Sequence, residues 1–307
     1  IGVWGTRAHS VVLAQALQRL GLSVVLASPA SRLLPGFSPS IAELLQAQLE
    51  AEGIRVVTAA TLKPSPNVPN SSTSSPSTAM VQSDALTITV DGIIAAEAHC
   101  SGLLNLNLPP QVKAIADGIP VNARLQTVHP RIYACGYAIN AYSIPTVAIA
   151  EAEVAVDNAL SIPYRRVSYR TLPRLVPTDP PIARVGLTEQ QARQIHGDIT
   201  VLKQPITPSR QAQLDQTTLG LCQLILSKRG TILGAEAIGP NVQDWFSPLT
   251  WALAHRVTLQ SLPQTRSYPA YGEVIAQLRE QWRHQSQHNW RRNSLELLFN
   301  WRRDWTR

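Results

Sequence analysis

The first sixty residues alternate between short apolar runs and amphipathic stretches. Residues 1–4 (IGVW) and 24–27 (VVLA) are continuous apolar runs, typical of strands buried on both faces of a parallel sheet. Between them lies an apolar stripe at helical spacing, formed by Val11, Leu13, Ala14, Leu17 and Leu20. Gly21 follows this stripe and is well placed to end the helix. The pattern predicts a strand, a helix and a second strand.

A second helix and a third strand are predicted next. Ser40 and Glu43 have the spacing of a capping box, and the helix is expected to run on to Gly53. Residues 54–57 (IRVV) are predicted to form the next strand. Strands and helices that alternate at this length predict a parallel sheet with crossover helices, and therefore an α/β fold.

The following segment changes in character. Residues 63–79 hold six Ser, four Pro and two Thr, which leaves little to bury. We therefore expect a disordered surface loop over 63–83. Residues 85–90 alternate like a half-buried strand, and 92–96 are expected to form the last strand of this domain.

The second half of the chain predicts other elements. Residues 131–136 are expected to form a strand followed by a glycine turn, and Pro145 is expected to open a helix that runs through Ala159. Further strands are predicted at Ile199–Lys203, Gly220–Ser227 and Ile232–Ile238, and further helices at Thr188–Ile195, Val242–His255 and Tyr271–Trp282. This mixture fits an α+β layer.

Composition narrows the class of protein. A chain of 307 residues suggests about two domains, and the three cysteines show no metal-ligand or dithiol spacing. No apolar run is long enough to span a membrane, and Ile1 lacks the charged lead of a signal peptide. These features favour a reducing compartment, and we expect a cytoplasmic protein. The absence of an initiator Met suggests a fragment or a processed product.

The net charge of +7 is concentrated at the C-terminal end. Residues 283–307 carry six arginines against Glu296 and Asp304, together with Trp and Leu residues at helical spacing. This pattern is typical of a helix on an anionic membrane surface, but also of a helix that docks on the protein's own dimer, or of a disordered extension. Nucleic-acid binding is not expected, because no such motif is present.

Two stretches resemble one protein family. Residues 169–189 (YRTLPRLVPTDPPIARVGLTE) resemble the opening of the dimerisation domain of the class I pyridine nucleotide-disulfide oxidoreductases, which include dihydrolipoamide dehydrogenase and mercuric reductase. Residues 127–137 (TVHPRIYACGY) resemble the family's second flavin motif, T-x-x-P-x-I-Y-A-x-G-D. The resemblance implies FAD and NAD(P)H as cofactors and a homodimer formed through 164–282. It also implies that the family's N-terminal FAD domain, with its redox dithiol, is missing.

The resemblance divides the chain into four parts. These are an NAD(P)-binding Rossmann-like domain with a parallel sheet (1–102), the returning segment of the FAD domain (103–163), an α+β dimerisation domain (164–282) and the basic tail (283–307).

The first strand–helix turn, residues 5–10 (GTRAHS), aligns with the family's G-x-G-x-x-G turn. Gly5 keeps the glycine of the tight turn, Arg7 takes the position next to the pyrophosphate, and Ser10 takes the third glycine position. A helix N-terminus still offers N–H donors to phosphate. The alternative is a plain turn without a ligand.

The end of the second strand normally carries an acidic residue for the ribose hydroxyls of NADH. This chain has Ser28 there, and Arg32 follows nearby. Nothing at Ser28 repels a 2′-phosphate, so NADPH is at least as well accommodated as NADH. A loop without a ligand remains the alternative.

The flavin motif keeps Gly136 but has Tyr137 where the family has an Asp that binds the ribityl chain. The helix that follows resembles the one whose N-terminus faces the flavin, which implies contacts from Thr146, Val147 and Ala148. Residues 91–98 (DGIIAAEA) align with a further nucleotide motif, from which Glu97, Ala98, Ser101 and Gly102 depart.

The C-terminal site of the family has the pattern H-P-T-x-x-E, in which His is an acid/base and Glu orients it. Here Tyr268 replaces the His and Glu273 is retained (YPAYGE). Tyr is a poor general base near neutral pH. The alternative is that Tyr268 packs at a subunit interface and that Glu273 caps the following helix.

Two functions follow. The first is part of an oxidoreductase that passes hydride from NAD(P)H through FAD to a disulfide, a metal ion or another acceptor. The second is an inactive dimeric scaffold with altered cofactor sites, which could dock through its basic tail.

Overall fold

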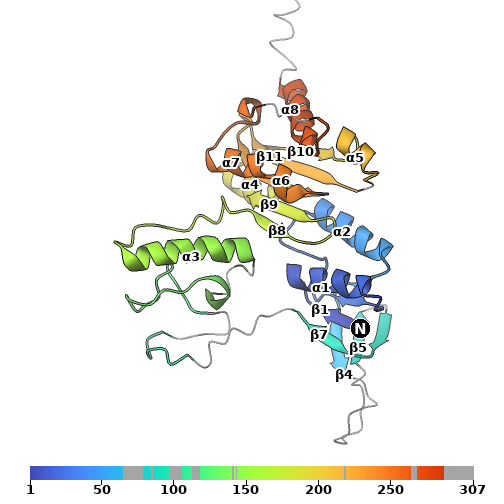
Figure 1. Cartoon of the computed structure of the whole chain (residues 1–307), viewed down its shortest axis with the longest axis vertical. Coiled ribbons are helices and arrows are strands. Elements are labelled where there is room, and N and C mark those ends of the chain that lie inside the picture. The colour runs from blue at the N-terminus through green and yellow to red at the C-terminus, as the bar shows by residue number, and fades with distance from the viewer. Residues whose placement is uncertain are drawn as a thin grey trace, which may run out of the picture. The chain divides into compact units, whose positions relative to one another are not determined.

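The computed structural model describes most of the chain, and it falls into two compact units, Ile1–Gly186 and Leu187–Arg307 (Figure 1). The described residues are 1–64, 79–83, 86–96, 106–112, 118–139, 142, 144–217, 219–263 and 268–286. Among them, no helix combines the length and the apolar character needed to cross a bilayer.

The first unit contains a four-stranded sheet in the order β3-β2-β1-β7, and every pair in it is parallel. Its strands are β1 (Gly2–Trp4), β2 (Val25–Ala27), β3 (Arg55–Val57) and β7 (Ile93–Ala95). Helix α1 (Ala8–Arg19) connects β1 to β2, and α2 (Pro39–Ala51) connects β2 to β3. The predicted parallel α/β arrangement is confirmed.

Both helices are held by their apolar sides and end at glycines. Buried apolar side chains on α1 and α2 are Val11, Ala14, Ile41, Ala42, Leu45 and Leu49. Each large one contributes about 1.5–3 kcal/mol through burial. Gly21 (φ +89°) and Gly53 (φ +92°) follow the helices in the conformation that glycine adopts most readily, as predicted.

The start of α2 differs from its prediction. Ser38 occupies the N-cap position and Pro39 opens the helix, so Ser40 and Glu43 do not form the predicted capping box. The prolyl ring presets a helical φ and removes an N–H that would have no intrahelical acceptor, so the helix begins before Ser40.

The predicted loop over 63–83 is wrong at both ends, where strands lie. Strands β4 (Thr61–Pro64), β5 (Ala79–Ser83) and β6 (Leu86–Val90) form an antiparallel sheet. Val81 is buried against Ala27 and Val57, which accounts for the ordering of β5. The Ser- and Pro-rich centre, 65–78, lies outside the described residues.

The rest of the first unit is built on helix α3 (Pro145–Leu160), which begins at Pro145 as predicted. A separate core packs α3 against the returning segment, through Val112, Ile119, Leu125, Ala134, Ile139, Val154 and Ala155. The predicted strand at 131–136 is reduced to one bridge, between Gln126 and Tyr133. A turn replaces it, because the Thr127 hydroxyl accepts from His129 N–H and donates to the Ile132 carbonyl. The hairpin of β8 (Arg174–Val176) and β9 (Ile182–Gly186) completes the unit.

The second unit is an α+β layer, as predicted. Its antiparallel neighbours are β10 (Ile199–Pro205), β11 (Leu221–Ser227) and β12 (Ile232–Ile238). Its helices are α4 (Glu189–His196), α5 (Arg210–Leu214), α6 (Val242–Trp245), α7 (Ser247–Ala254) and α8 (Glu273–Ser286), with the short helix η3 (Leu259–Ser261). The predicted helix Val242–His255 is split because Pro248 opens α7. Residues 287–307 of the tail lie outside the described residues, so its role stays a prediction.

Candidate functional site

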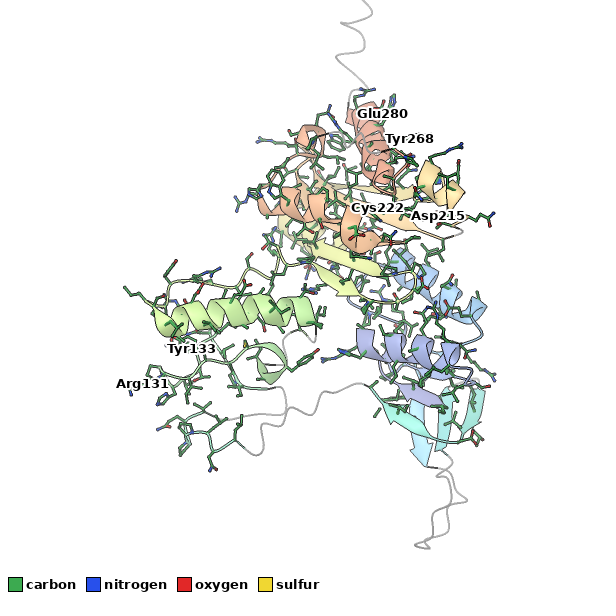
Figure 2. The ribbon with its side chains drawn as sticks, in the orientation of Figure 1. Arg131, Tyr133, Asp215, Cys222, Tyr268 and Glu280 are labelled. Atoms are coloured by element: carbon green, nitrogen blue, oxygen red, sulfur yellow. The ribbon has the colours of Figure 1, made fainter. Side chains whose placement is uncertain are left out.

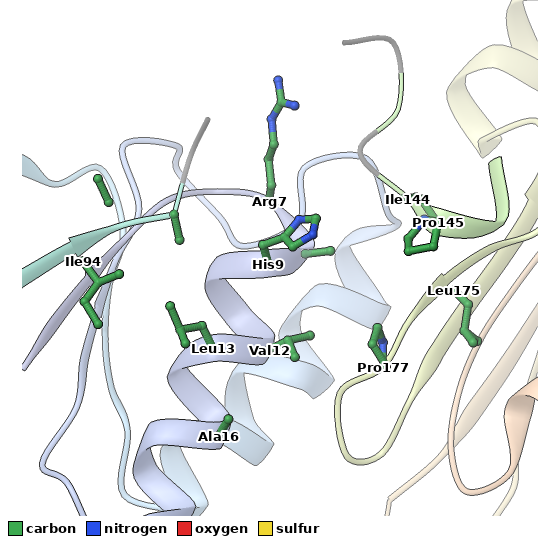
Figure 3. Close-up of a pocket in the computed structure, with 13 residues that line it drawn as sticks. Arg7, His9, Val12, Leu13, Ala16, Ile94, Ile144, Pro145, Leu175 and Pro177 are labelled. Atoms are coloured by element: carbon green, nitrogen blue, oxygen red, sulfur yellow. The ribbon is translucent and has the colours of Figure 1, made fainter. Parts of the chain in front are cut away.

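A cavity of about 510 Å³ opens beside α1 in the first unit. Figure 3 shows side chains of α1 on one side and those of the β8 segment and the start of α3 on the other. Most of its lining is apolar, and comes from Val12, Leu13, Ala16, Ile94, Ile144, Pro145, Leu175 and Pro177. Arg7 and His9 supply the cationic and imidazole groups at the beginning of α1. A ligand with apolar rings and an anionic group would suit this combination.

The strand–helix turn keeps its backbone role. Gly5 is buried and its N–H donates to the Ala27 carbonyl at 3.0 Å, which ties the turn to β2. Arg7 is the exposed N-cap residue of α1. Ser10 is fully buried, and its hydroxyl donates to the Arg7 carbonyl at 2.7 Å. The predicted close packing of helix and strand at this turn is therefore compatible with a serine.

Ser28, which follows β2, is fully buried and belongs to a turn. Its Oγ accepts the Ala30 N–H at 3.2 Å, and its own N–H donates to the Val57 carbonyl at 2.8 Å. Arg32 donates to the Pro35 carbonyl at 3.1 Å, which closes the same loop. The hydroxyl of Ser28 thus shapes the loop, and no acidic group stands at the end of β2.

The flavin-motif turn lies at helix η2 (Gly136–Ile139). Gly136 has φ +63°, and a Cβ there would lie 3.2 Å from the Cβ of Ala148, so only glycine suits this position. The ring of Tyr137 meets the ring of His9 edge-on, with centroids 6.4 Å apart. This contact brings the flavin motif next to the dinucleotide turn.

A buried carboxyl group supports this turn from α3. Glu151 is fully buried; its Oε2 accepts the Gly136 N–H at 2.6 Å and its Oε1 accepts the Tyr169 hydroxyl at 2.9 Å. A buried carboxyl group is tolerated only when it is hydrogen-bonded in this way. Burial, followed by the bond to Glu151, raises the pKa of Tyr169 well above its usual range. Burial, followed by the charge of Glu151, also raises the pKa of Cys135.

The N-terminus of α3 holds the other predicted flavin contacts. Ile144 is the N-cap, and its carbonyl accepts the N–H groups of Val147 and Ala148, both at 3.1 Å. Thr146 is exposed in the first turn, where an N–H has no intrahelical acceptor. Of these three residues, Thr146 is therefore best placed to donate to a ligand.

A second cavity, of about 280 Å³, shares Arg7, His9 and Ile144 with the first. It is lined by Arg7, Phe37, Tyr142 and Arg174 among others, and none of the described residues that line it is acidic. The guanidinium carbon of Arg174 lies 4.0 Å from the centroid of the Tyr142 ring. The cavity thus joins cationic groups to aromatic rings.

Tyr268, which Figure 2 labels, and Glu273 both belong to the second unit. Tyr268 is 73% exposed. Glu273 opens α8, and its carboxyl oxygens accept the N–H groups of Ala270 at 3.0 Å and Arg210 at 3.3 Å. Ala270 precedes α8 and Arg210 opens α5, so Glu273 holds the backbone at the beginnings of both helices. Close by in sequence, Tyr271 donates to Asp215 at 2.6 Å.

The structure brings only some of the predicted residues together. Tyr137 contacts His9, two residues after Arg7 at the beginning of α1, and Gly136 is joined to α3 through Glu151. Glu97, Ala98, Ser101 and Gly102 lie outside the described residues. Sequence reasoning missed His9, Tyr142, Glu151, Tyr169 and Arg174. Glu151 was detectable, because it occupies a core position of an otherwise apolar stripe with Val147 and Val154.

The chain is similar to known proteins over most of its length. Residues 3–159 match the family described as pyridine nucleotide-disulphide oxidoreductase, and residues 172–279 match its dimerisation domain. Dihydrolipoyl dehydrogenase of Bacillus subtilis is 31% identical over 230 residues, which cover 74% of this chain and 48% of that protein. Mercuric reductase of Staphylococcus aureus is 28% identical over 274 residues, which cover 88% of this chain and 49% of that protein.

Solved structures show the same fold. The Cu(II) complex of the HOCl-induced flavoprotein disulfide reductase RclA from Escherichia coli superposes with a TM-score of 0.75 at 21% identity, covering 91% of this chain and 63% of that one. LpdA from Mycobacterium tuberculosis gives a TM-score of 0.73 at 18% identity, covering 92% and 61%. The chain spans about half the length of the curated relatives it matches.

The fold and the site define an α/β dinucleotide-type unit followed by a dimerisation-type domain. The chain belongs to the pyridine nucleotide-disulphide oxidoreductase family. Membership implies FAD and NAD(P) as cofactors. The first-unit residues fit a dinucleotide, because Arg7 and the N-terminus of α1 border two cavities, and the described residues that line them include no acidic group. For the flavin, the glycine turn is intact, but Tyr137 takes the place of a charged residue.

Proposed function

We propose that the chain forms the nicotinamide-binding and dimer-forming part of an oxidoreductase that uses FAD and NAD(P)H. In such a protein FAD would carry hydride from NAD(P)H to a disulfide, a metal ion or another acceptor. The contact between His9 and Tyr137 supports this proposal most directly, because it joins the flavin motif to the dinucleotide turn, where His9 lines the larger cavity. The residues of this chain would bind and orient the two cofactors.

The choice between NADH and NADPH follows from the loop after β2. The Ser28 hydroxyl is engaged with Ala30, and Arg32 lies in the same loop. A 2′-phosphate would therefore meet no carboxylate at Ser28, and a cation is near in sequence. We therefore propose that the chain binds NADPH at least as tightly as NADH.

Binding of the nucleotide tests the proposal without any acceptor. The 307-residue chain is titrated with NADPH and NADH, and binding is followed by isothermal calorimetry. We expect saturable binding of NADPH, weakened several-fold by Arg7→Glu, because the substitution places a negative charge at the N-terminus of α1. Leu20→Gln, on the exposed end of α1, is the control. A chain that binds neither nucleotide at millimolar concentration contradicts the proposal.

The second candidate function is a scaffold without catalysis. Two replacements favour it: the exposed Arg7 stands at the second glycine position of the turn, and Tyr137 stands where the family has an Asp. It predicts a stable homodimer formed through 164–282 that binds neither nucleotide. Analytical ultracentrifugation measures the dimer, and the titrations separate the two candidates.

A role in acceptor chemistry is proposed for the second unit. Tyr268 is exposed and could contact the acceptor, whereas Glu273 holds the backbone that precedes α8 through Ala270. Tyr268→Phe in the flavin-loaded protein is then expected to lower turnover, while Glu273→Gln lowers thermal stability.

A further inference from the structure

A chain of four side chains links the interior of α3 to the second cavity. It begins at Glu151, whose two carboxyl oxygens are both engaged, with Gly136 N–H at 2.6 Å and with the Tyr169 hydroxyl at 2.9 Å. Glu151 is fully buried and each of its carboxyl oxygens accepts a hydrogen bond, which fixes the conformation of its side chain. The Tyr169 ring, whose hydroxyl donates one of these bonds, is therefore held in a defined position.

The held ring of Tyr169 supports a second ring. The centroids of Tyr142 and Tyr169 are 5.0 Å apart with the rings tilted by 42°, a favourable aromatic contact. The Arg174 guanidinium lies on the Tyr142 ring at 4.0 Å from its centroid. The order of contacts therefore runs from Glu151 through Tyr169 and Tyr142 to Arg174.

The outer two members line the cavity of about 280 Å³, together with Arg7. A guanidinium placed over a ring still carries N–H donors that can bind a planar or tetrahedral anion. No ion pair of Arg174 occurs among the residues that the structure describes. The wall therefore presents one aromatic side chain and one cation to the cavity.

We propose that Tyr142 and Arg174 form a nucleotide-binding wall, in which Arg174 contacts a phosphate of the nicotinamide dinucleotide, and that Glu151 is a positioning residue which holds this wall through Tyr169. The inference rests on the proposed function, because it assigns further residues to the same ligand. Unlike the anion site at the family's glycine-rich turn, the proposed wall uses side chains from the β8 hairpin and from the segment before α3.

Equilibrium titration of the 307-residue chain with NADPH tests the wall. Arg174→Gln is expected to weaken binding about 10-fold, which is the loss of one charge-assisted hydrogen bond. Arg55→Gln, an exposed arginine on β3, is the matched control and should bind as the unaltered chain does. Tyr142→Leu should also weaken binding, whereas Tyr142→Phe, which keeps the ring, should not.

A double-mutant cycle tests the positioning role. Tyr169→Phe keeps the ring and removes only the hydroxyl that Glu151 holds, and it is expected to weaken NADPH binding about 3-fold. In the Arg174→Gln background the same change should have no further effect on affinity, although it should lower thermal stability equally in both backgrounds. A purely structural role of Tyr169 would give the same loss of affinity in both.

The outcomes separate the two proposals. If the chain binds NADPH and both Arg174→Gln and Tyr142→Leu bind as tightly as Arg55→Gln, the wall is refuted and the proposed function stands. If the unaltered chain binds neither NADPH nor NADH, both are refuted. Far-ultraviolet circular dichroism of each variant confirms that it is folded. If a larger change such as Tyr142→Leu unfolds the chain, the variants Tyr142→Phe and Tyr169→Phe, which keep the aromatic rings, are compared instead.

Discussion

The hydroxyl of Tyr169 donates a 2.9 Å hydrogen bond to Oε1 of Glu151, a carboxyl group that is fully buried in α3. The other oxygen of Glu151 accepts the Gly136 N–H, so that with the bond from Tyr169 both carboxyl oxygens are hydrogen-bonded. The turn that carries Tyr137 is thus supported by Glu151, a residue that lies outside the flavin motif of residues 127–137.

Removal of the Tyr169 hydroxyl is expected to destabilise the first unit. Tyr169→Phe leaves a buried acceptor unsatisfied and should lower the free energy of unfolding by about 1–3 kcal/mol, measured by urea denaturation. Tyr164→Phe, at a site that is 73% exposed, is the control and should change little. The pKa of Tyr169 is raised in the folded chain, so its contribution is complete below the unfolded pKa of about 10 and is lost only as pH rises through the folded pKa. The difference between Tyr169→Phe and the unaltered chain should therefore be constant from neutral pH to about pH 9; a difference that fades within that range would contradict the assignment.

Gly136 is expected to tolerate no side chain. Gly136→Ala must adopt φ +63° and place its Cβ 3.2 Å from Ala148, so we expect a loss of about 1–2 kcal/mol in unfolding free energy. Gly92→Ala is the matched control, because a Cβ there has no neighbour within 4 Å. Equal midpoints in thermal denaturation of the two variants would show that the Gly136 turn is not constrained as described.

Cys135 should react slowly with iodoacetamide. Burial and the charge of Glu151 raise the pKa of its thiol, and only the thiolate reacts. The midpoint of its alkylation rate against pH, followed by mass spectrometry of the Cys135 peptide, should lie above the ordinary value of about 8.5. Glu151→Gln removes the second cause and should move the midpoint down; an unchanged midpoint would exclude an electrostatic effect of Glu151 on Cys135.

In the second unit, Gly230 and Gly197 separate backbone strain from crowding. Both have positive φ, +78° and +68°, but only at Gly230 would a Cβ meet the Trp282 ring, at 2.9 Å. Gly230→Ala should cost about 1–3 kcal/mol more than Gly197→Ala in urea unfolding, which is the cost of overpacking. Tryptophan fluorescence should also change only for Gly230→Ala, and equal effects of the two substitutions would argue against the packing of Trp282 on Gly230.

The fold was largely predictable because its signals are local. The apolar stripe that ends at Gly21 and the run 24–27 require only their neighbours in sequence to be interpreted. The predictions were wrong where two local sequence patterns compete. Pro39 starts α2 ahead of the Ser40–Glu43 pair. Strand β5 forms beside a Ser- and Pro-rich segment because Val81 is buried.

By itself the sequence determined the order of elements, the family and the positions at which its motifs are altered, because hydrophobic period, glycine placement and motif spacing are properties of a linear chain. Only the tertiary structure decided what surrounds those positions. It placed Tyr137 against His9, and it connected Glu151 to Arg174 through two tyrosines from separate segments. Such contacts join residues far apart along the chain, and no local pattern encodes them, because they depend on how α1, α3 and the β8 hairpin pack together.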